Sequence, residues 1–370
     1  MTAPAPEARA STPDDDARRD ALSGRLFEAL LGTFDLLSVQ LGIELGLYAA
    51  LRDHGPSTPP QLAAQAGIDA RYAREWLEQQ AVTRLLDVDD VAADAEERRY
   101  SLPAGHADVL LEPDDLSTMI PVAQATHSVV EAWPALLAAY RTGGGIHWNA
   151  YPRISEVQEA ANRPLFRHLL AQEWLPAIPD VDARLRAGDV RVADVACGGG
   201  WSTIAIARAY PAAEVHGLDL DAEAIARART KARAEGLEDR ARFHVVDAED
   251  HSLDGTFDLV TIFEALHDMS RPVEVLEACR RLLAPGGTVL VMDEKVAEQF
   301  TVPGDEIERL MYGYSVFVCL PNGLAESPSA GTGTVMRPDT VRRYAADAGF
   351  ASTTILPIDH EVFRFYRLDP

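Results

Sequence analysis

The sequence predicts an α/β protein of two domains, in which a helical, winged-helix-like part precedes a domain built on a parallel sheet. The chain has 370 residues, which is long for one domain and comfortable for two. Hydrophobic residues make up 47% of it, so a full core is possible. Apolar residues at helical spacing dominate the N-terminal third, whereas short apolar runs alternate with helical patterns between about 189 and 298.

Four segments are expected along the chain. Residues 1–18 are acidic and lack an apolar core, so they are predicted to be a disordered tail and not a signal peptide. Residues 19–110 are predicted to form the helical, winged-helix-like domain. Residues 111–187 form a helical connector rich in aromatic residues, and residues 188–370 form the sheet domain.

The N-terminal domain begins with a helical apolar pattern. Residues 41–56 are expected to continue as a helix that stops at Gly55-Pro56. Thr58 and Gln61 have the spacing of a capping box, a further helix follows over 73–86, and residues 85–103 resemble two short strands around an acidic wing. The residues that set the first pattern are Leu22, Leu26, Leu30 and Phe34.

Composition excludes several classes of protein. The 34 Lys and Arg residues against 58 Asp and Glu residues give a net charge of −24, which repels a polyanion such as DNA. Cys197, Cys279 and Cys319 lie far apart without a CxxC pair or a His cluster, which favours a reduced, cytoplasmic protein without structural metal. No uninterrupted apolar run reaches the roughly 20 residues that span a membrane.

The segment RVADVACGGG, residues 191–200, predicts a buried strand followed by a tight glycine-rich turn. Glycines there let a cofactor lie against the backbone. The next strand ends near Asp219, about 20 residues past the last glycine, where a carboxylate is placed to accept ribose hydroxyls. Such a turn alone fits S-adenosylmethionine (SAM), a dinucleotide or no ligand. The turn lacks GxGxxG, and Asp194 suits the SAM ammonium, directly or through water, better than a pyrophosphate.

The alternation of strands and helices continues to the end of the chain. A third strand is expected to end at Asp247, and a fourth over 257–266 runs into His267. Further elements are expected as a strand over 288–294, a helix over 338–348 and a strand pair over 353–358 and 361–368.

The motifs DVACGGG, LDL, DAED, FDLV and LLAPGG resemble, in order and spacing, those of class I SAM-dependent methyltransferases. The resemblance covers about 110 residues. It implies SAM as the cofactor and a Rossmann-like seven-stranded methyltransferase sheet whose last strand is antiparallel. One departure is Ala196, where that family usually has glycine, and alanine is small enough that SAM binding is expected to survive.

The resemblance extends to the remaining segments. The helical, winged-helix N-terminal part resembles the dimerisation domain of two-domain small-molecule O-methyltransferases, which implies a homodimer. TGGGIHWNAY, FEALHDM and YSVFVCLP resemble an actinobacterial subgroup near indole C3-methyltransferases. The cofactor-binding residues expected on this basis are Asp194, Ala196, Cys197, Gly198, Gly200, Asp219, Leu220, Asp247, Ala248 and Phe263.

His267 is the candidate general base for methyl transfer, because it follows the fourth strand at the carboxyl end of the sheet. The alternative is a structural histidine that caps the next helix. The resemblance places Asp293 where a carboxylate orients the histidine, with Glu294 as a substitute, while Met269 replaces the family's tryptophan. Glu264, the third catalytic candidate, contacts acceptor or cofactor, or is simply exposed.

The acceptor is predicted to be a small, aromatic, natural-product-like molecule. Oxygen is the default acceptor atom, and nitrogen or indole C3 are the alternatives. Two other functions stay open, a SAM-binding winged-helix regulator and a SAM-binding fold used for chemistry other than methyl transfer. The regulator is disfavoured because the predicted recognition helix carries Glu75 and Glu78 beside Arg71 and Arg74. Acceptor contacts, unless they are core residues, are Trp148, Tyr151, Trp174 and Tyr314.

Overall fold

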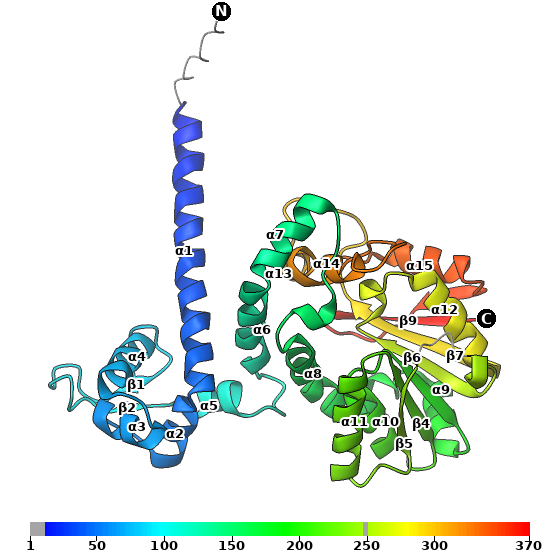
Figure 1. Ribbon diagram of the computed structural model, residues 1–370, viewed down its shortest axis with the longest axis horizontal. Helices are drawn as coiled ribbons and strands as arrows, with labels where there is room; N and C mark the ends of the chain where they lie inside the picture. The colour runs from blue at the N-terminus through cyan, green and yellow to red at the C-terminus, as the bar shows by residue number, and fades with distance from the viewer. Residues whose placement is uncertain (1–11, 247–250) are drawn as a thin grey trace, which may run out of the picture. The chain divides into compact units, whose positions relative to one another are not determined.

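The computed structural model describes residues 12–246 and 251–370 and divides into two compact units, Met1–Leu111 and Glu112–Pro370 (Figure 1). The segment predicted as a connector, 111–187, is therefore almost entirely part of the unit that contains the sheet. The two units are described separately below.

The first unit starts with a long helix, α1 (Pro13–Glu44). Thr12 accepts a hydrogen bond from the backbone of Asp15, and the Asp15 side chain accepts one from the backbone of Thr12, so a capping box fixes the start. The predicted disordered tail, 1–18, is therefore wrong for residues 13–18, and residues 1–11 lie outside the described part. Among the described helices, α1 is long and apolar enough to cross a membrane by length and composition alone.

The winged-helix prediction for the first unit is confirmed, with one difference. The helix expected to run through 41–56 is interrupted, because Gly46 adopts a left-handed conformation with φ of 68° between α1 and α2 (Leu47–His54). The capping box is present, and the backbone N–H of Thr58 donates to Gln61 Oε1 at 3.0 Å. The remaining elements are α3 (Pro59–Ala66), α4 (Ala70–Val82), β1 (Asp87–Val88), β2 (Tyr100–Ser101) and α5 (Ala104–Leu111).

The second unit begins with helices that precede its sheet. Gly145 lies between α7 and η1, where a Cβ would come within 2.1 Å of the Ala325 backbone nitrogen, so this glycine permits a close backbone contact. The helices and turns are α6 (Ile120–Glu131), α7 (Trp133–Thr142), η1 (Trp148–Ala150), α8 (Ile154–Leu165), the π-helix η2 (Phe166–Trp174) and α9 (Pro179–Ala187).

A seven-stranded sheet forms the centre of the second unit, in the order β5-β4-β3-β6-β7-β9-β8. The first five strands of this order are parallel, while β9 pairs antiparallel with both neighbours, as the sequence predicts. Apolar runs buried on both faces explain the parallel part. The strands are β3 (Arg191–Val195), β4 (Glu214–Asp219), β5 (Ala241–Val245), β6 (Phe257–Phe263), β7 (Leu283–Glu294), β8 (Ser352–Ile355) and β9 (Phe363–Asp369).

Helices cover the sheet and bury two apolar clusters, one containing Val192 and Ile204 and the other Val260 and Leu276. The carboxyl ends of the parallel strands meet at one edge, where ligands bind in open α/β sheets. The helices and turns of this part are α10 (Trp201–Ala209), α11 (Ala222–Ala234), η3 (His251–Leu253), η4 (Leu266–Asp268), α12 (Pro272–Leu282), α13 (Glu306–Tyr314), the π-helix η5 (Ser315–Cys319), α14 (Leu320–Gly323) and α15 (Pro338–Asp347).

Candidate active site

The glycine-rich turn after β3 leaves open space above its backbone. A Cβ built on Gly198 would meet nothing within 4 Å, and its φ is +50°. The Gly198 N–H donates to Asp219 Oδ2 at 2.8 Å, and the Asp221 N–H donates to Asp219 Oδ1 at 2.8 Å. The carboxylate at the tip of β4 therefore lies directly beside the open turn. These residues fit SAM, whose nucleoside needs a bare backbone and a ribose acceptor side by side.

Two other glycines of the turn serve packing, which corrects the expectation that they all make room for a cofactor. A Cβ on Gly200 would lie 2.5 Å from the Phe243 ring. A Cβ on Gly199 would lie 2.1 Å from the carboxyl carbon of Glu159 on α8. Gly200 thus allows close contact with the core, and Gly199 allows α8 to approach the turn.

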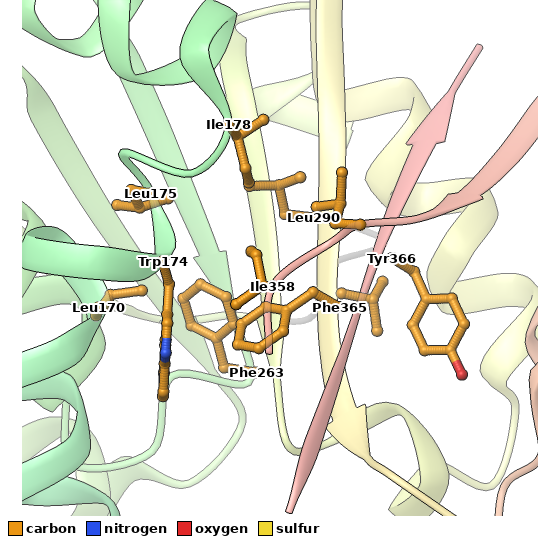
Figure 2. Close-up of a pocket in the computed structure, with 11 residues that line it drawn as sticks. Leu170, Trp174, Leu175, Ile178, Phe263, Leu290, Ile358, Phe365 and Tyr366 are labelled. Carbon is orange, nitrogen blue, oxygen red and sulfur yellow. The ribbon is translucent and has the colours of Figure 1, made fainter. Parts of the chain in front are cut away.

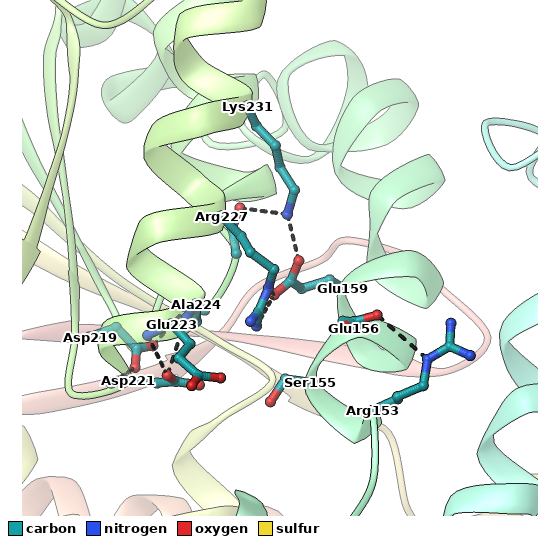
Figure 3. A network of polar contacts seen from close by, with 12 residues as sticks. Arg153, Ser155, Glu156, Glu159, Asp219, Asp221, Glu223, Ala224, Arg227 and Lys231 are labelled. Atoms are coloured by element: carbon teal, nitrogen blue, oxygen red, sulfur yellow. Dashed lines mark hydrogen bonds and ion pairs between the residues drawn. The ribbon is translucent and has the colours of Figure 1, made fainter.

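Glu159 joins α8 to α11 through two cations (Figure 3). Its Oε1 accepts from Arg227 Nη2 at 2.7 Å, and its Oε2 accepts from Lys231 Nζ. Lys231 Nζ also donates to the Gly199 carbonyl at 3.0 Å. We call this arrangement of Glu159, Arg227 and Lys231 the α8–α11 clasp. The clasp holds α8 against the glycine-rich turn.

Asp194 is placed differently from the prediction. Its side chain is buried, with Oδ2 accepting from Ser202 and Thr203 at 2.6 Å each and Oδ1 accepting from Thr261 at 2.8 Å. Three hydroxyl groups thus surround the carboxylate and tie β3 to α10 and β6. This enclosure argues against a direct contact with the SAM ammonium and gives Asp194 a bracing role, while the predicted contact through water stays a prediction.

The other predicted cofactor residues separate into two groups. Leu220 is 68% exposed beside Asp219, so it is open to a ligand. The Cys197 and Phe263 side chains are buried in the core, so only their backbone is available for the expected contacts. Ala196 has a φ of +57° at the point where β3 turns. Asp247 and Ala248 lie outside the described residues.

His267 is buried on η4 and is held by the end of β7. Its Nδ1 lies 2.8 Å from Asp293 Oδ1 and 2.9 Å from Glu294 Oε2. Since an ionised carboxylate only accepts, Nδ1 carries a proton, and Nε2 can accept one when the ring is neutral. The alternative of a helix cap is wrong, because α12 follows Arg271 as its N-cap residue and no side chain caps it. Nε2 lies 3.4 Å from Asp268 Oδ1.

Burial and mutual charge interactions shift the pKa values of His267, Asp293 and Glu294. Burial lowers the pKa of His267, but Glu294, Asp293 and Asp268 outweigh burial and raise that pKa well above its usual value. Burial raises the pKa of Asp293, but His267 outweighs it and holds that pKa below its usual value. Burial raises the pKa of Glu294 well above its usual value. The opposite directions of these two shifts show that Asp293 keeps its negative charge more readily than Glu294 does.

Glu264 lies at the end of β6 in a left-handed conformation with φ of +54°. Gln158 Nε2 on α8 donates to its Oε1 at 2.9 Å. Burial raises the pKa of Glu264 to about 7, although the amide of Asn162 and the charge of His267 act in the opposite direction. The carboxyl group is therefore part of the same edge as His267, and the prediction of a merely exposed strand end is wrong.

Three of the four predicted acceptor contacts gather near His267. Tyr151 and Cys319 share an apolar cluster against which Trp148 and Tyr314 pack. Cys319 also interacts with His267, which brings the cluster to the histidine. Tyr151 donates its hydroxyl to the Phe317 carbonyl at 2.7 Å.

Trp174 does not join this group. It is buried among apolar residues on one face of the sheet, with its ring centroid 5.0 Å from that of Phe365 (Figure 2). The narrow pocket beside it is lined by apolar side chains and by Tyr366. The prediction of Trp174 as an acceptor contact is therefore corrected to a core position, because helix η2 turns the indole toward β9.

Sequence reasoning missed several residues of this edge. Gln158 and Glu159 are adjacent on α8, outside the methyltransferase motifs, and the sequence predicts for Cys319 only that it lacks a disulfide partner. The sequence offers no distinct signal for Gln158 and Glu159, because α8 carries other polar residues at helical spacing from them, such as Ser155 and Asn162. All three cysteines are free and buried.

Comparisons with known proteins agree with this geometry. Residues 192–287 match the family model of a methyltransferase domain, and residues 34–111 match a Rv2258c-like winged HTH domain. The chain is 25% identical over 253 residues to a ubiquinone biosynthesis O-methyltransferase of Psychrobacter arcticus, which covers 65% of this chain and 90% of that protein. For other relatives of the same name, the match spans between 46% and 67% of their length.

Solved structures show the same fold over nearly the whole chain. The mitomycin 7-O-methyltransferase MmcR superimposes with a TM-score of 0.71 at 19% identity and covers 96% of this chain and 99% of its own. Human N-acetylserotonin methyltransferase in complex with SAM gives a TM-score of 0.66 at 20% identity and covers 97% and 99%. At these identities the likeness establishes the fold.

Proposed function

We propose that this chain, a SAM-dependent methyltransferase with an N-terminal winged-helix domain, transfers the methyl group of SAM to an oxygen of a small, aromatic natural-product acceptor. The observation that carries the proposal is the His267–Asp293 pair at the edge where the glycine-rich turn and Asp219 also lie. A proton acceptor and a nucleoside site thus meet at the carboxyl ends of neighbouring strands.

The chain's own residues supply binding, orientation and a proton acceptor. SAM, when bound, supplies a methyl group already activated by positive sulfur. The open turn at Gly198 and the Asp219 carboxylate would hold its nucleoside. Asp293 holds the imidazole of His267 so that Nε2 accepts the acceptor's hydroxyl proton as the new bond forms. Because methyl transfer needs no leaving-group protonation, one base is sufficient.

An aromatic acceptor is supported by the cluster around Cys319. Trp148 and Tyr151 precede β3 in the chain, and Tyr314 lies between β7 and β8. All three pack into one apolar group with Cys319, which interacts with His267. Flat rings bind well between such side chains. Oxygen is favoured by the names of similar proteins, ubiquinone biosynthesis O-methyltransferases and mitomycin 7-O-methyltransferase. Methylation of nitrogen or of indole C3 is the alternative within the same reaction class.

The proposed assembly is a cytoplasmic homodimer formed through the N-terminal unit. Apolar side chains of α1 are exposed in the isolated chain, including Phe27 at 59% and Phe34 at 56%. Exposed apolar patches of this extent favour burial against a partner. A second copy is the partner that the two-domain organisation favours.

The function is tested by separating binding from turnover. His267→Ala should bind S-adenosylhomocysteine (SAH) normally and lose about 100-fold or more of the rate of SAH release with an accepted acceptor. Asp219→Ala should instead weaken SAH binding about 10-fold or more in calorimetry, because the ribose hydroxyls lose a charged acceptor. Full activity of His267→Ala would exclude the general-base role, and turnover of an acceptor without SAH release would exclude methyl transfer.

The winged-helix domain also raises the regulator as a second candidate. In α4, however, Arg71 is paired with Glu75 and Arg74 lies 3.0 Å from Glu96. Arginines already paired with carboxylates offer little to DNA phosphates. A gel shift on promoter DNA that depended on SAM would favour the regulator over the enzyme.

A further inference from the structure

Glu264 carries a buried carboxylate oxygen that makes no hydrogen bond of good geometry, although the Asn162 amide lies near the carboxyl group. Its Oε1 accepts from Gln158, whereas Oε2 is buried and has no hydrogen-bond partner among the residues that the structure describes. A buried carboxylate oxygen that loses water without gaining a donor is costly, so a ligand group that donates to Oε2 would be stabilised there.

The backbone at Glu264 is also unusual for this residue type. A φ of +54° places a residue with a full side chain in the left-handed region, which glycine occupies far more easily. Such conformations persist where the surrounding structure imposes them, and they cluster at binding sites. Here the conformation turns the chain sharply at the end of β6 and sets the direction of the carboxyl group.

The position of Glu264 relates it to the cofactor turn. β3 and β6 are neighbouring parallel strands, and Val195 pairs with Ile262. The glycine-rich turn and Glu264 therefore leave the sheet side by side. Helix α8 touches both, because Gln158 contacts Glu264 while Glu159 lies against Gly199.

We propose that Glu264 binds the α-ammonium group of the methionine part of SAM. The inference rests on the proposed function, since it assigns one contact of the same cofactor. An ammonium group offers the donors that Oε2 lacks, and a carboxylate is its strongest partner. Asp194, the other carboxylate next to the turn, is already enclosed by three hydroxyl groups. Gln158 fixes Oε1 and leaves Oε2 for the ligand.

The proposed contact should change the protonation state of Glu264 when the ligand binds, and this change can be measured. Since burial raises its pKa to about 7, the carboxyl group is partly protonated at neutral pH. A bound ammonium favours the ionised form, so binding lowers that pKa and releases protons. Affinity for a ligand with the ammonium should therefore rise as pH rises through 7.

The test compares two ligands that differ in the amino-acid part. SAH retains the ammonium and carboxylate, whereas 5′-methylthioadenosine retains the nucleoside and lacks both. Calorimetry at pH 7 should show that Glu264→Gln weakens SAH binding about 10- to 100-fold, the usual worth of a charged hydrogen bond. Binding of 5′-methylthioadenosine should hardly change. Asp194→Asn serves as the comparison variant and should keep the wild-type preference for SAH.

The outcomes separate this inference from the proposed function. If the wild-type protein binds neither ligand, the methyltransferase proposal fails. If it binds SAH and Glu264→Gln binds it equally well, or if Asp194→Asn loses the preference for SAH, only the role of Glu264 is overturned. If Glu264→Gln does not fold, proton release on ligand binding is measured with the wild-type protein near pH 7. Proton release with SAH but not with 5′-methylthioadenosine supports the contact. No proton release with SAH overturns it.

Discussion

At the scale of single residues, the site depends on a backbone position that usually requires glycine. Ala196 directly follows β3 with a φ of +57°, where a Cβ costs roughly 1–2 kcal/mol. The family whose motifs it resembles places glycine there, and the structure gives the physical reason. Alanine is tolerated because its side chain is the smallest that still carries a Cβ.

The effect of substitutions at Ala196 on the free energy of unfolding should depend on this backbone strain. Ala196→Gly should leave the free energy of unfolding unchanged or raise it by up to about 1 kcal/mol, since relief of strain outweighs the entropy of glycine. Ala196→Val should lower it by about 2–3 kcal/mol, because a branched Cβ is hardly compatible with a left-handed conformation. Urea unfolding measures both variants. Equal stability of Ala196→Val and the wild type would contradict the left-handed backbone conformation at residue 196.

The pH dependence of turnover should report the carboxylates around His267. A base must be neutral, and the pKa of His267 is raised by Glu294, Asp293 and Asp268 in spite of burial. Turnover should therefore rise with pH through a value above the ordinary histidine pKa. Asp293→Asn should move this rise to lower pH while reducing the maximal rate about 10-fold or more, because the ring loses both charge and orientation. An unchanged pH profile of kcat in Asp293→Asn would contradict the pairing of Asp293 with His267.

At the scale of secondary-structure elements, α8 connects the cofactor turn with the acceptor side. Its Glu159 forms the α8–α11 clasp (Figure 3). The neighbouring Gln158 contacts Glu264. Two adjacent residues on a helix point in different directions, so one helix reaches two sites. The glycine at 199 is what allows this approach.

The clasp can be tested by a double-mutant cycle. Gly199→Ala should push the Glu159 carboxylate out of its ion pairs and lower the free energy of unfolding by about 1–3 kcal/mol. In a Glu159→Ala background the same change should cost about 1 kcal/mol less. Gly198→Ala is the matched control, because its Cβ meets open space and its cost should not depend on Glu159. Strictly additive effects of Gly199→Ala and Glu159→Ala would show that the two residues do not interact.

At the scale of the whole molecule, the apolar surface of α1 needs a partner. The side chains are exposed along most of the helix, and the apolar stretch meets the length and composition of a membrane span, with 17% of it buried. A second copy and a lipid surface are therefore the two occupants to be distinguished. The charges of Glu28 and Asp35 within α1 favour a protein partner, because charged groups are costly in a bilayer.

Charged substitutions in α1 should separate these two cases. The double variant Leu26→Glu, Leu30→Glu should sediment as a monomer where the wild type sediments as a dimer, since both exposed leucines would become charged. Glu28→Lys, at another exposed α1 position, is the control and should remain dimeric. A wild-type protein that is monomeric in solution and floats with lipid vesicles would overturn the dimer and favour a membrane surface.

The sequence by itself determined the order of strands and helices, the glycine-rich turn, the acidic tip of β4 and the candidate base His267. Each of these follows from local periodicity or from residue types at short spacing, which the chain carries without reference to distant segments. Only the tertiary structure decided that Asp194 is enclosed by hydroxyls, that Trp174 lies in the core and that Glu264 keeps a buried oxygen unpaired. These facts depend on which side chains from α8, η2 and β9 arrive at the sheet, and such long-range contacts leave no periodic trace in the sequence.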